Sequence, residues 1–270
     1  MRCIKILIVI GLVMVIIAQA AYAQLSGYPR SARDIMLKVD ERGEVKTEYN
    51  KTRMTLINKK GKTRVRDVVR YKKSFNGEKG IDTKSLIFFE SPADIRGTGL
   101  LLWSYTNAGK EDDRWLYLPA LKKIRRIAGE SKNEYFMGTD FTYDDMGGRN
   151  VDDDTHKLLG KEELDGVECY KIESIPVDKD DQYSKKIAWV TPDKWITAKV
   201  EFYDNNKQLQ KTLTISDIRK VDKIWTPHLL FMDNLSKKHQ TKIEVIEVSF
   251  NSEMKDQIFT TTTLQRGRVQ

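Results

Sequence analysis

Short segments in which apolar and polar residues alternate follow one another from Val45 to Leu264, and turn-forming residues separate them. Residues 58–61 (Asn-Lys-Lys-Gly) and 165–166 (Asp-Gly) are two such turns, and both are typical of β-hairpins. The alternation has the two-residue period of a strand. We therefore predict about eleven to thirteen strands in an antiparallel meander, arranged as a sandwich, a barrel or a half-barrel.

The boundaries of the predicted elements follow from these patterns. The predicted strands are residues 49–58, 63–73, 85–90, 100–103, 115–119, 121–127, 155–163, 167–174, 187–191, 197–203, 210–217, 225–234 and 241–250. Residues 258–264 could add a closing strand. One helix precedes them, because Ser31 is a candidate N-cap with Asp34 three residues later. Its apolar residues recur at helical spacing and should face a sheet.

Residues 1–23 have the parts of a secretory signal peptide. A positive start at Arg2 and Lys5 precedes an unbroken apolar run, and a small-x-small signature ends at Ala23. The apolar run is shorter than the roughly 20 residues that a membrane span needs, although an uncleaved anchor is the alternative. We predict cleavage after Ala23, a periplasmic location and a single domain at residues 24–270.

Charge and cysteine content limit the function further. The formal net charge of +8 falls by two when Arg2 and Lys5 leave with the signal peptide. This basicity favours a weak, transient contact with an anionic membrane surface, whereas no motif suggests nucleic-acid binding. Cys169 then remains alone, so no internal disulfide is expected, and its alternating context predicts a small core residue.

No catalytic, cofactor or metal motif stands out in the sequence. His156, His228 and His239 lie in separate segments, without the spacing of a zinc site. An acidic patch is the best candidate for binding a cation, although a solvated acidic loop is the preferred interpretation. It comprises Asp144, Asp145, Asp152, Asp153 and Asp154. We predict a non-enzymatic protein without a cofactor or a metal.

The central stretch, residues 96–145, is the main functional lead. Leu100 and Leu102 lie on one face of a strand, and Leu101, Trp103 and Tyr105 lie on the other. Apolar residues on both faces require cover on both sides. Ordinary core on both faces is the simpler interpretation, and a cavity holding an apolar guest on one face is the functional one.

The segment at residues 63–73 differs, because its two faces are unlike. Val65, Val69 and Tyr71 share one face. The other face is cationic, and we expect it to be solvated, with phosphate binding as the alternative. Its members are Arg64, Arg66, Val68, Arg70 and Lys72.

Three motifs in the central stretch support a family resemblance. They are R-G-T-G-L-L-L-W (residues 96–103), W-L-Y-L-P-A-L-K-K-I-R-R-I (115–127) and F-M-G-T-D-F-T-Y-D-D (136–145). Together with the signal peptide, the helix and the meander, they resemble bacterial outer-membrane lipoprotein-sorting proteins, which are treponemal-type members of the LolA-like superfamily. The resemblance implies an incomplete antiparallel β-barrel, mainly β, whose strongly curved sheet wraps around helices and leaves an apolar cavity.

The resemblance also implies a function. LolA carries lipoprotein acyl chains across the periplasm, so we predict a periplasmic carrier or chaperone that binds acylated lipoprotein or another lipid for sorting towards the outer membrane. The residues predicted to line its cavity are Leu100, Leu102, Trp103, Trp115, Tyr117, Phe136 and Phe141.

The alternative function is a binding or sensor module. Related proteins are often found beside inner-membrane exporters of the resistance–nodulation–division type, so the partner would be such a transporter or a signalling protein. The residues predicted to contact it are basic: Arg96, Lys122, Arg125 and Arg126.

Overall fold

The computed structural model describes residues 31–42 and 45–269. The predicted signal peptide and its cleavage site lie outside these residues. Within them, no helix has the length and apolar character needed to cross a membrane.

The described residues form one sheet of 13 strands. The strands are β1 (Thr47–Ile57), β2 (Thr63–Ser74), β3 (Ile81–Ser91), β4 (Gly99–Tyr105), β5 (Asp113–Leu118), β6 (Lys123–Ile127), β7 (Asp154–Leu164), β8 (Val167–Pro176), β9 (Lys185–Val190), β10 (Thr197–Tyr203), β11 (Leu209–Val221), β12 (Ile224–Asn234) and β13 (His239–Phe250). The helices are α2 (Ala32–Arg42) and α3 (Thr261–Arg266), with 3-10 turns η1 (Glu78–Gly80), η2 (Pro119–Leu121), η3 (Gly129–Asn133), η4 (Phe136–Gly138), η5 (Val151–Asp153) and η6 (Asp256–Ile258).

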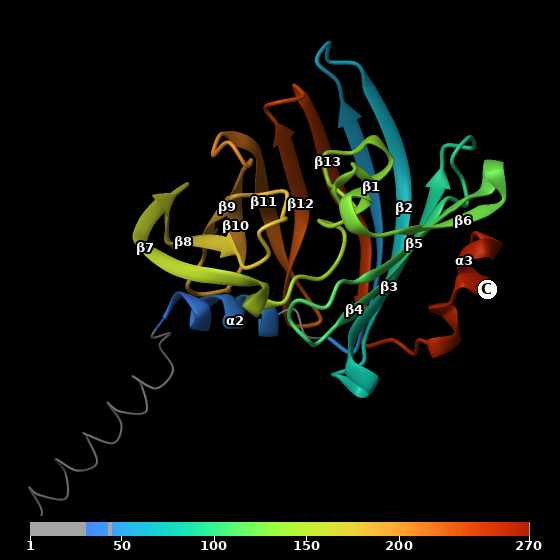
Figure 1. Cartoon of the computed structure of the whole chain (residues 1–270), viewed down its shortest axis with the longest axis horizontal. Coiled ribbons are helices and arrows are strands. Elements are labelled where there is room, and N and C mark those ends of the chain that lie inside the picture. The colour runs from blue at the N-terminus through green and yellow to red at the C-terminus, as the bar shows by residue number, and fades with distance from the viewer. Residues whose placement is uncertain (1–30, 43–44, 270) are drawn as a thin grey trace, which may run out of the picture.

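Every neighbouring pair of strands is antiparallel, as the meander predicts. The spatial order runs from β6 to β1, then through β13 back to β7. The first and last strands of the meander therefore pair at its centre, with Glu48 opposite Phe250 and Ile57 opposite Gln240. The sheet is strongly curved and unclosed, and β6 and β7 are its two edges (Figure 1).

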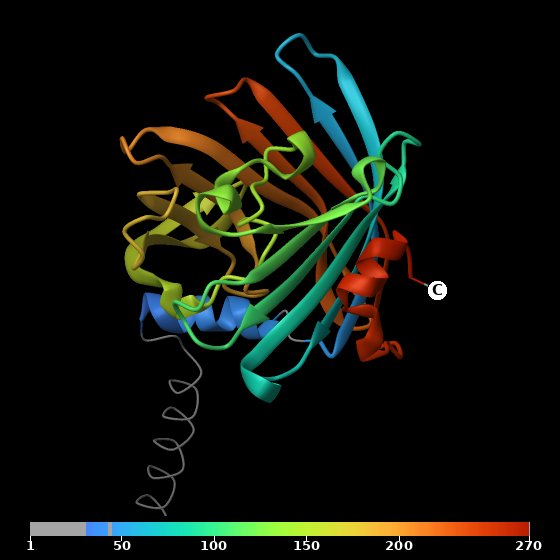
Figure 2. The same cartoon turned by 45° about the vertical axis from the view of Figure 1, so that its right-hand side comes forward.

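The order of the strands determines where residues 128–153 must lie. They connect β6 to β7, which are consecutive in sequence but stand at opposite edges of the sheet. This interior segment, residues 128–153, crosses the concave side of the sheet (Figure 2). The segment contains only short 3-10 turns, and its aromatic residues pack in the apolar interior of the curve.

Two apolar clusters cover the two faces of the N-terminal half of the sheet. Leu100, Leu102 and Leu116 belong to a concave cluster that includes Phe136 and Phe141 of the interior segment. Leu101 and Tyr117 belong to a convex cluster, with Trp103 and Trp115 packed against it. The predicted separation of the central strands into two apolar faces is therefore confirmed, and protein covers both.

The helix α2 begins as the sequence predicts. The Ser31 hydroxyl accepts a hydrogen bond from the Asp34 amide at 3.1 Å, and the Asp34 carboxylate accepts one from the Ser31 amide at 3.0 Å. This reciprocal cap satisfies two amides that the helix leaves unpaired. The apolar stripe of α2, Ala32 and Ile35, packs on Ile172 and other residues of β8 and β9.

The predicted closing strand at residues 258–264 is wrong. These residues form η6 and the start of α3, which lies on the convex face. Threonine has a high propensity for strands, and this run contains several threonines. Here, however, the Thr260 hydroxyl accepts a hydrogen bond from the Thr263 amide and so caps the helix. Gly99 permits this packing, since a Cβ there would lie 2.5 Å from the Phe88 ring and 2.8 Å from Leu264.

The prediction that the cationic face of β2 is simply solvated is also wrong. Val68 belongs to the concave cluster, so Arg66, Arg70 and Lys72, which share its face, point into the curve of the sheet. Arg66 donates to the Met137 carbonyl and lies over the Phe89 ring. Of this row, Arg64 at the outer end of the strand is exposed. The opposite face is the one that the convex cluster covers.

Candidate functional site

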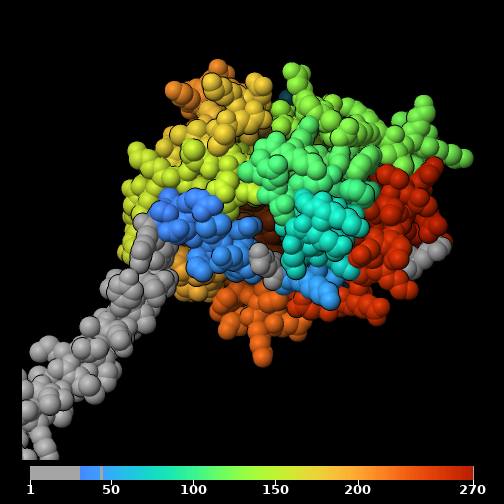
Figure 3. Space-filling view, turned by 60° about the horizontal axis from the view of Figure 1, so that its bottom comes forward, coloured from blue at the N-terminus to red at the C-terminus, as the bar shows by residue number. Residues whose placement is uncertain are grey.

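The concave side of the sheet encloses a hollow that the interior segment does not fill. Three adjoining cavities of about 390, 340 and 690 Å³ make up this hollow. Val45 lines the first two, Phe141 the last two, and Arg149 the first and third. An opening between α2 and the β2–β3 turn leads into it (Figure 3).

The second cavity has the most apolar lining. Its inward-facing residues come from β1, β2, β3, β12 and β13, together with Phe141 and Met146 of the interior segment. They include Met54, Val68, Ile87, Leu230, Ile243 and Val245. Because strands from both ends of the chain meet here, the cavity exists only once β1 has paired with β13.

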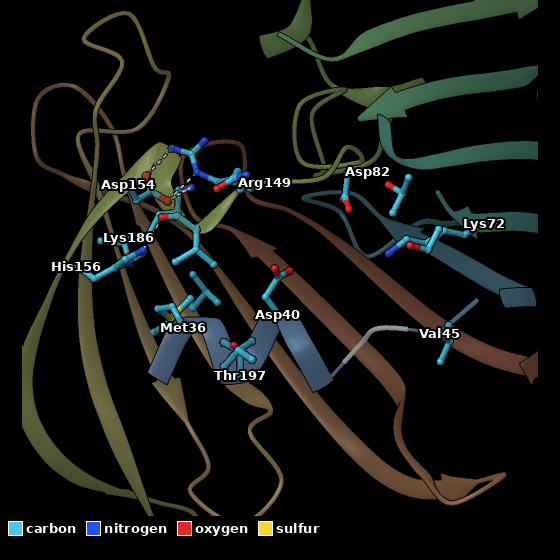
Figure 4. Close-up of a pocket in the computed structure, with 18 residues that line it drawn as sticks. Met36, Asp40, Val45, Lys72, Asp82, Arg149, Asp154, His156, Lys186 and Thr197 are labelled. Atoms are coloured by element: carbon cyan, nitrogen blue, oxygen red, sulfur yellow. Dashed lines mark hydrogen bonds and ion pairs between the residues drawn. The ribbon is translucent and has the colours of Figure 1, made fainter. Parts of the chain in front are cut away.

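The first cavity lies between α2 and the sheet and is polar. Figure 4 shows Arg149, Asp154 and Lys186 on one wall, and Lys72 with Asp82 on the other. Burial opposes the charge of Arg149, but its hydrogen bonds to Asp154 and Asp181 prevail, and its pKa is raised above the ordinary value. Lys186 lies 3.6 Å from Asp154, and burial lowers its pKa. The charges of this wall are therefore largely matched within it.

Lys72 on the other wall is not paired with a carboxylate among the described residues. In the part of the chain that the structure describes, its ammonium group forms no hydrogen bond or ion pair. Burial lowers its pKa, the like charge of Arg70 lowers it further, and Glu48, Asp82 and Asp40 act in the opposite direction. An ammonium group that loses water without gaining a partner lowers the stability of the folded protein.

A buried ion pair fixes the interior segment inside the curve. The Lys211 side chain is fully buried and donates to the Asp145 carboxylate at 2.7 Å and to the Asp140 carbonyl at 3.1 Å. The Tyr183 hydroxyl donates to Asp145 as well, at 3.0 Å. These bonds tie the interior segment to β11 and set one wall of the hollow.

A second buried ionic group lies where the interior segment meets β5. Arg114 is almost fully buried and binds Asp144 at 2.7 Å, with Asp112 at 3.5 Å. Burial raises the pKa of Asp112 to about 6, although Arg114 and the Ser104 hydroxyl oppose the shift. Two carboxylates thus share one buried arginine beside the third cavity.

The acidic patch predicted from the sequence is dispersed among basic and amide partners. Asp144 binds Arg114, Asp145 binds Lys211, Asp152 binds Arg33, and Asp154 binds Arg149. The Asp153 carboxylate accepts hydrogen bonds from the backbone amides of Asn150 and Gly109. Each carboxylate therefore has a role in holding the interior segment and its flanks.

The seven residues predicted to line a lipid cavity are divided between the two faces. Leu100, Leu102 and Phe136 lie in the concave cluster but are buried by protein, whereas Phe141 lines the hollow itself. The other three lie with the convex cluster, on the side that α3 covers: Trp103, Trp115 and Tyr117. Lipid contact by these residues stays a prediction, and the geometry favours Phe141.

The residues predicted to contact a protein partner lie on the surface. Arg125 and Arg126 project from the edge strand β6 and pair with Glu134 and Asp113. Lys122 ends η2, and the Arg96 side chain donates to the Glu90 carbonyl at 2.9 Å. They are accessible, and their role stays a prediction.

Sequence reasoning missed most of the residues that line the hollow. Alternation separates two faces of β1, β2 and β13, but it does not say which face becomes concave. Lys72 and Arg70 carried a usable signal, because they continue the face of Val68, an apolar residue that must be buried.

The curved, unclosed sheet around an amphipathic hollow defines a protein of the LolA-like fold. A family model described only as an uncharacterized protein matches residues 81–266. A DUF1329 family protein from Desulfovibrio piger is 32% identical, with a TM-score of 0.82 over 86% of this chain and 97% of that one. The chain belongs to this DUF1329 family.

Two further solved structures share the architecture. A domain from Vibrio parahaemolyticus, described as an outer membrane lipoprotein-sorting protein domain, is 29% identical, with a TM-score of 0.81 over 87% of this chain and 98% of that one. A LolA superfamily protein from Nitrosomonas europaea is 20% identical, with a TM-score of 0.69 over 87% and 100%. No sequence among curated proteins matches the chain.

Proposed function

We propose that this protein is a non-enzymatic periplasmic carrier that binds an acyl chain of a lipid or lipoprotein in its hollow. The observation that carries the proposal is the apolar cavity of about 340 Å³ between β1, β2, β3, β12 and β13. The similarity to the Vibrio parahaemolyticus domain, which is described as a lipoprotein-sorting domain, supports an acylated ligand.

Burial of the acyl chain supplies the binding energy. Each methylene group that leaves water contributes about 0.8 kcal/mol, and ordering of the chain and loss of its free motion oppose this gain. Side chains that stay partly exposed inside the hollow, such as Leu230 and Val245, would gain cover from the ligand. Apolar surface of the hollow and apolar surface of the lipid would thus both be removed from water when the two associate.

Transport requires that the ligand can enter and leave. The opening beside α2 gives a route to the hollow without breaking the sheet. The net charge is +8 for the whole chain and falls by two without Arg2 and Lys5, so it still suits brief contact with an anionic membrane surface. An inner-membrane transporter as the donor of the cargo is the corresponding partner proposal.

The proposal predicts that a charge placed in the apolar cavity prevents uptake. We expect Val245→Glu to weaken binding of a fluorescent long-chain acyl probe by at least about tenfold, because the carboxylate would have to lose its water or leave the site. Titration of the purified protein with the probe measures the affinity, and thermal unfolding verifies that the variant is folded.

The next residue provides a matched control. Ile246 lies at the bulge of β13, is 58% exposed, and is absent from the lining of the cavity. Ile246→Glu adds the same charge to the same strand and should leave uptake unchanged. Equal binding by wild type and Val245→Glu would show that the acyl site is not this cavity.

A further inference from the structure

Three cations lie together at the α2 end of the hollow. Arg42 ends α2, and Arg70 and Lys72 face inward from β2. Across the described ranges, 31–42 and 45–269, none of the three forms an ion pair. The cationic site, Arg42, Arg70 and Lys72, contrasts with Arg149, Lys186 and Lys211, which have carboxylate partners in the same hollow.

The two arginines also retain unused hydrogen-bonding capacity. Among the residues that the structure describes, the Nε of Arg42 and the Nε of Arg70 are buried without a hydrogen-bond partner. Their other bonds go to neutral groups, from Arg42 to the Trp225 carbonyl at 2.9 Å and from Arg70 to the Ser85 hydroxyl at 3.2 Å. Buried donors without acceptors are rare in proteins and destabilise the fold unless a ligand satisfies them.

The cationic site adjoins the apolar cavity. Arg42 and Arg70 line that cavity, and Lys72 lies two residues beyond Arg70 on the same face of β2. Deeper along β2 and β1, the inward-facing residues become apolar at Val68 and Met54. The hollow is therefore lined by charged residues near its opening and by apolar residues further in.

Acidic residues near the site do not neutralise it by contact. Glu48 stands opposite Lys72 in the strand register, but its carboxylate accepts a hydrogen bond from Asn50 at 2.7 Å. Asp40 and Asp82 also face Lys72, and the like charge of Arg70 affects its pKa more than any of these three acids does. None of these three carboxylates forms an ion pair with the cationic site among the described residues.

We infer that the cationic site binds the anionic head group of the ligand, a carboxylate or a phosphate, while the single acyl chain attached to it occupies the apolar cavity. This inference rests on the proposed function, because it assigns the polar end of the same ligand. An arginine fork suits either oxyanion, and a lysine adds a point charge. The ligand class is an anionic amphiphile with one acyl chain.

Probes that share one fluorescent acyl chain and differ only in the head group test the inference. A carboxylate, a phosphate monoester and a neutral alcohol are titrated into the wild-type protein. We expect the carboxylate or the phosphate to bind at least about tenfold more tightly than the alcohol. The stronger of the two identifies a fatty acid or a phosphate-bearing lipid as the source.

A double variant removes the charges without changing the cavity. Arg70→Gln/Lys72→Gln should lose the preference for the anionic probe while its affinity for the alcohol stays the same. The matched control, Lys62→Gln/Arg64→Gln, removes two charges from the exposed outer end of the same hairpin and should keep the preference. The double variant should also resist heat as well as the wild type, because it loses buried, unpaired charge.

The outcomes separate the two proposals. If the wild-type protein binds all three probes equally, or if Arg70→Gln/Lys72→Gln keeps the preference, the head-group assignment is overturned and the acyl carrier stands. If the wild-type protein binds none of the probes, the acyl carrier is overturned, and the head-group assignment is overturned with it.

Discussion

Asp112 shows how a single buried carboxyl group makes stability depend on pH. Its pKa of about 6 in the folded protein lies above the value of 3.8 expected for the unfolded chain. The folded state therefore binds the proton more tightly between these values. This group lowers stability above pH 6, and the penalty disappears as the pH falls through 6 towards 3.8.

We predict that Asp112→Asn removes this part of the pH dependence. On going from pH 7.5 to pH 5, the wild-type unfolding free energy should gain about 1 kcal/mol relative to that of the variant. Urea unfolding at the two pH values measures the difference. Identical pH dependence of the two proteins would contradict the assignment.

The neighbouring residue provides a control of opposite sign. Hydrogen bonds from Tyr105 and Arg126 hold the pKa of Asp113 below its ordinary value, despite some burial. Asp113 therefore contributes stability at neutral pH that is lost as the pH falls through its folded pKa. As the pH falls, Asp113 lowers the unfolding free energy, so Asp113→Asn should make that decrease smaller. Asp112 raises the unfolding free energy over the same change, so Asp112→Asn should make that increase smaller.

Single residues also show why the sequence predicted only part of the site. Alternation separated Leu100 and Leu102 from Leu101 and Trp103, and both faces are indeed buried. The cationic row of β2 was interpreted as solvated, because lysine and arginine are usually exposed. Its inward direction depends on the curvature of the whole sheet, which no local pattern encodes.

Among the elements, the interior segment depends most on one contact, the ion pair of Lys211 and Asp145. Lys211 is fully buried, and the Tyr183 and Phe202 rings lie 5.1 and 5.0 Å from its ammonium group. Removal of one partner leaves a buried charge without compensation. The position of the segment therefore relies on both partners together.

We predict that Lys211→Met lowers the unfolding free energy by about 3–5 kcal/mol, since Asp145 would lose its cation. Chemical denaturation measures the loss. Lys220→Met serves as the control, because Lys220 lies on the same strand but is exposed, and it should change stability by less than about 0.5 kcal/mol. Similar values for the two variants would show that the ion pair does not hold the segment.

Local sequence patterns correctly predicted most of the helices and strands but not the C-terminal helix α3. The capping box of α2 and the hairpin turns act within a few residues, so the sequence displays them directly. The C-terminal helix was predicted as a strand, since threonine-rich segments favour strands and the helix is only one and a half turns long. Its position is set by packing on Phe88 and Gly99, far away in the sequence.

At the scale of the molecule, neither half of the chain has a complete core. The concave cluster combines Met54, Val68 and Ile87 from the first half with Phe202 and Met232 from the second. The central pairing of β1 with β13 also joins the two halves. The sequence could indicate a meander, but this pairing between its ends is a property of the complete sheet.

We predict that fragments 31–150 and 151–270 do not fold separately but assemble when mixed. Each alone should give the narrow amide dispersion of an unfolded chain in a proton–nitrogen correlation spectrum, because half of its cluster and one sheet partner are missing. The mixture should give the dispersed spectrum of the intact protein. A dispersed spectrum from either fragment alone would contradict the prediction.

The unclosed sheet gives the hollow a mechanical property. A sheet closed on itself has a diameter fixed by its number of strands and their stagger. Here β6 and β7 remain separate edges, so small changes of twist at each strand pair add up along the sheet without breaking its hydrogen bonds. We therefore expect the diameter of the hollow to vary with little loss of hydrogen bonding in the sheet.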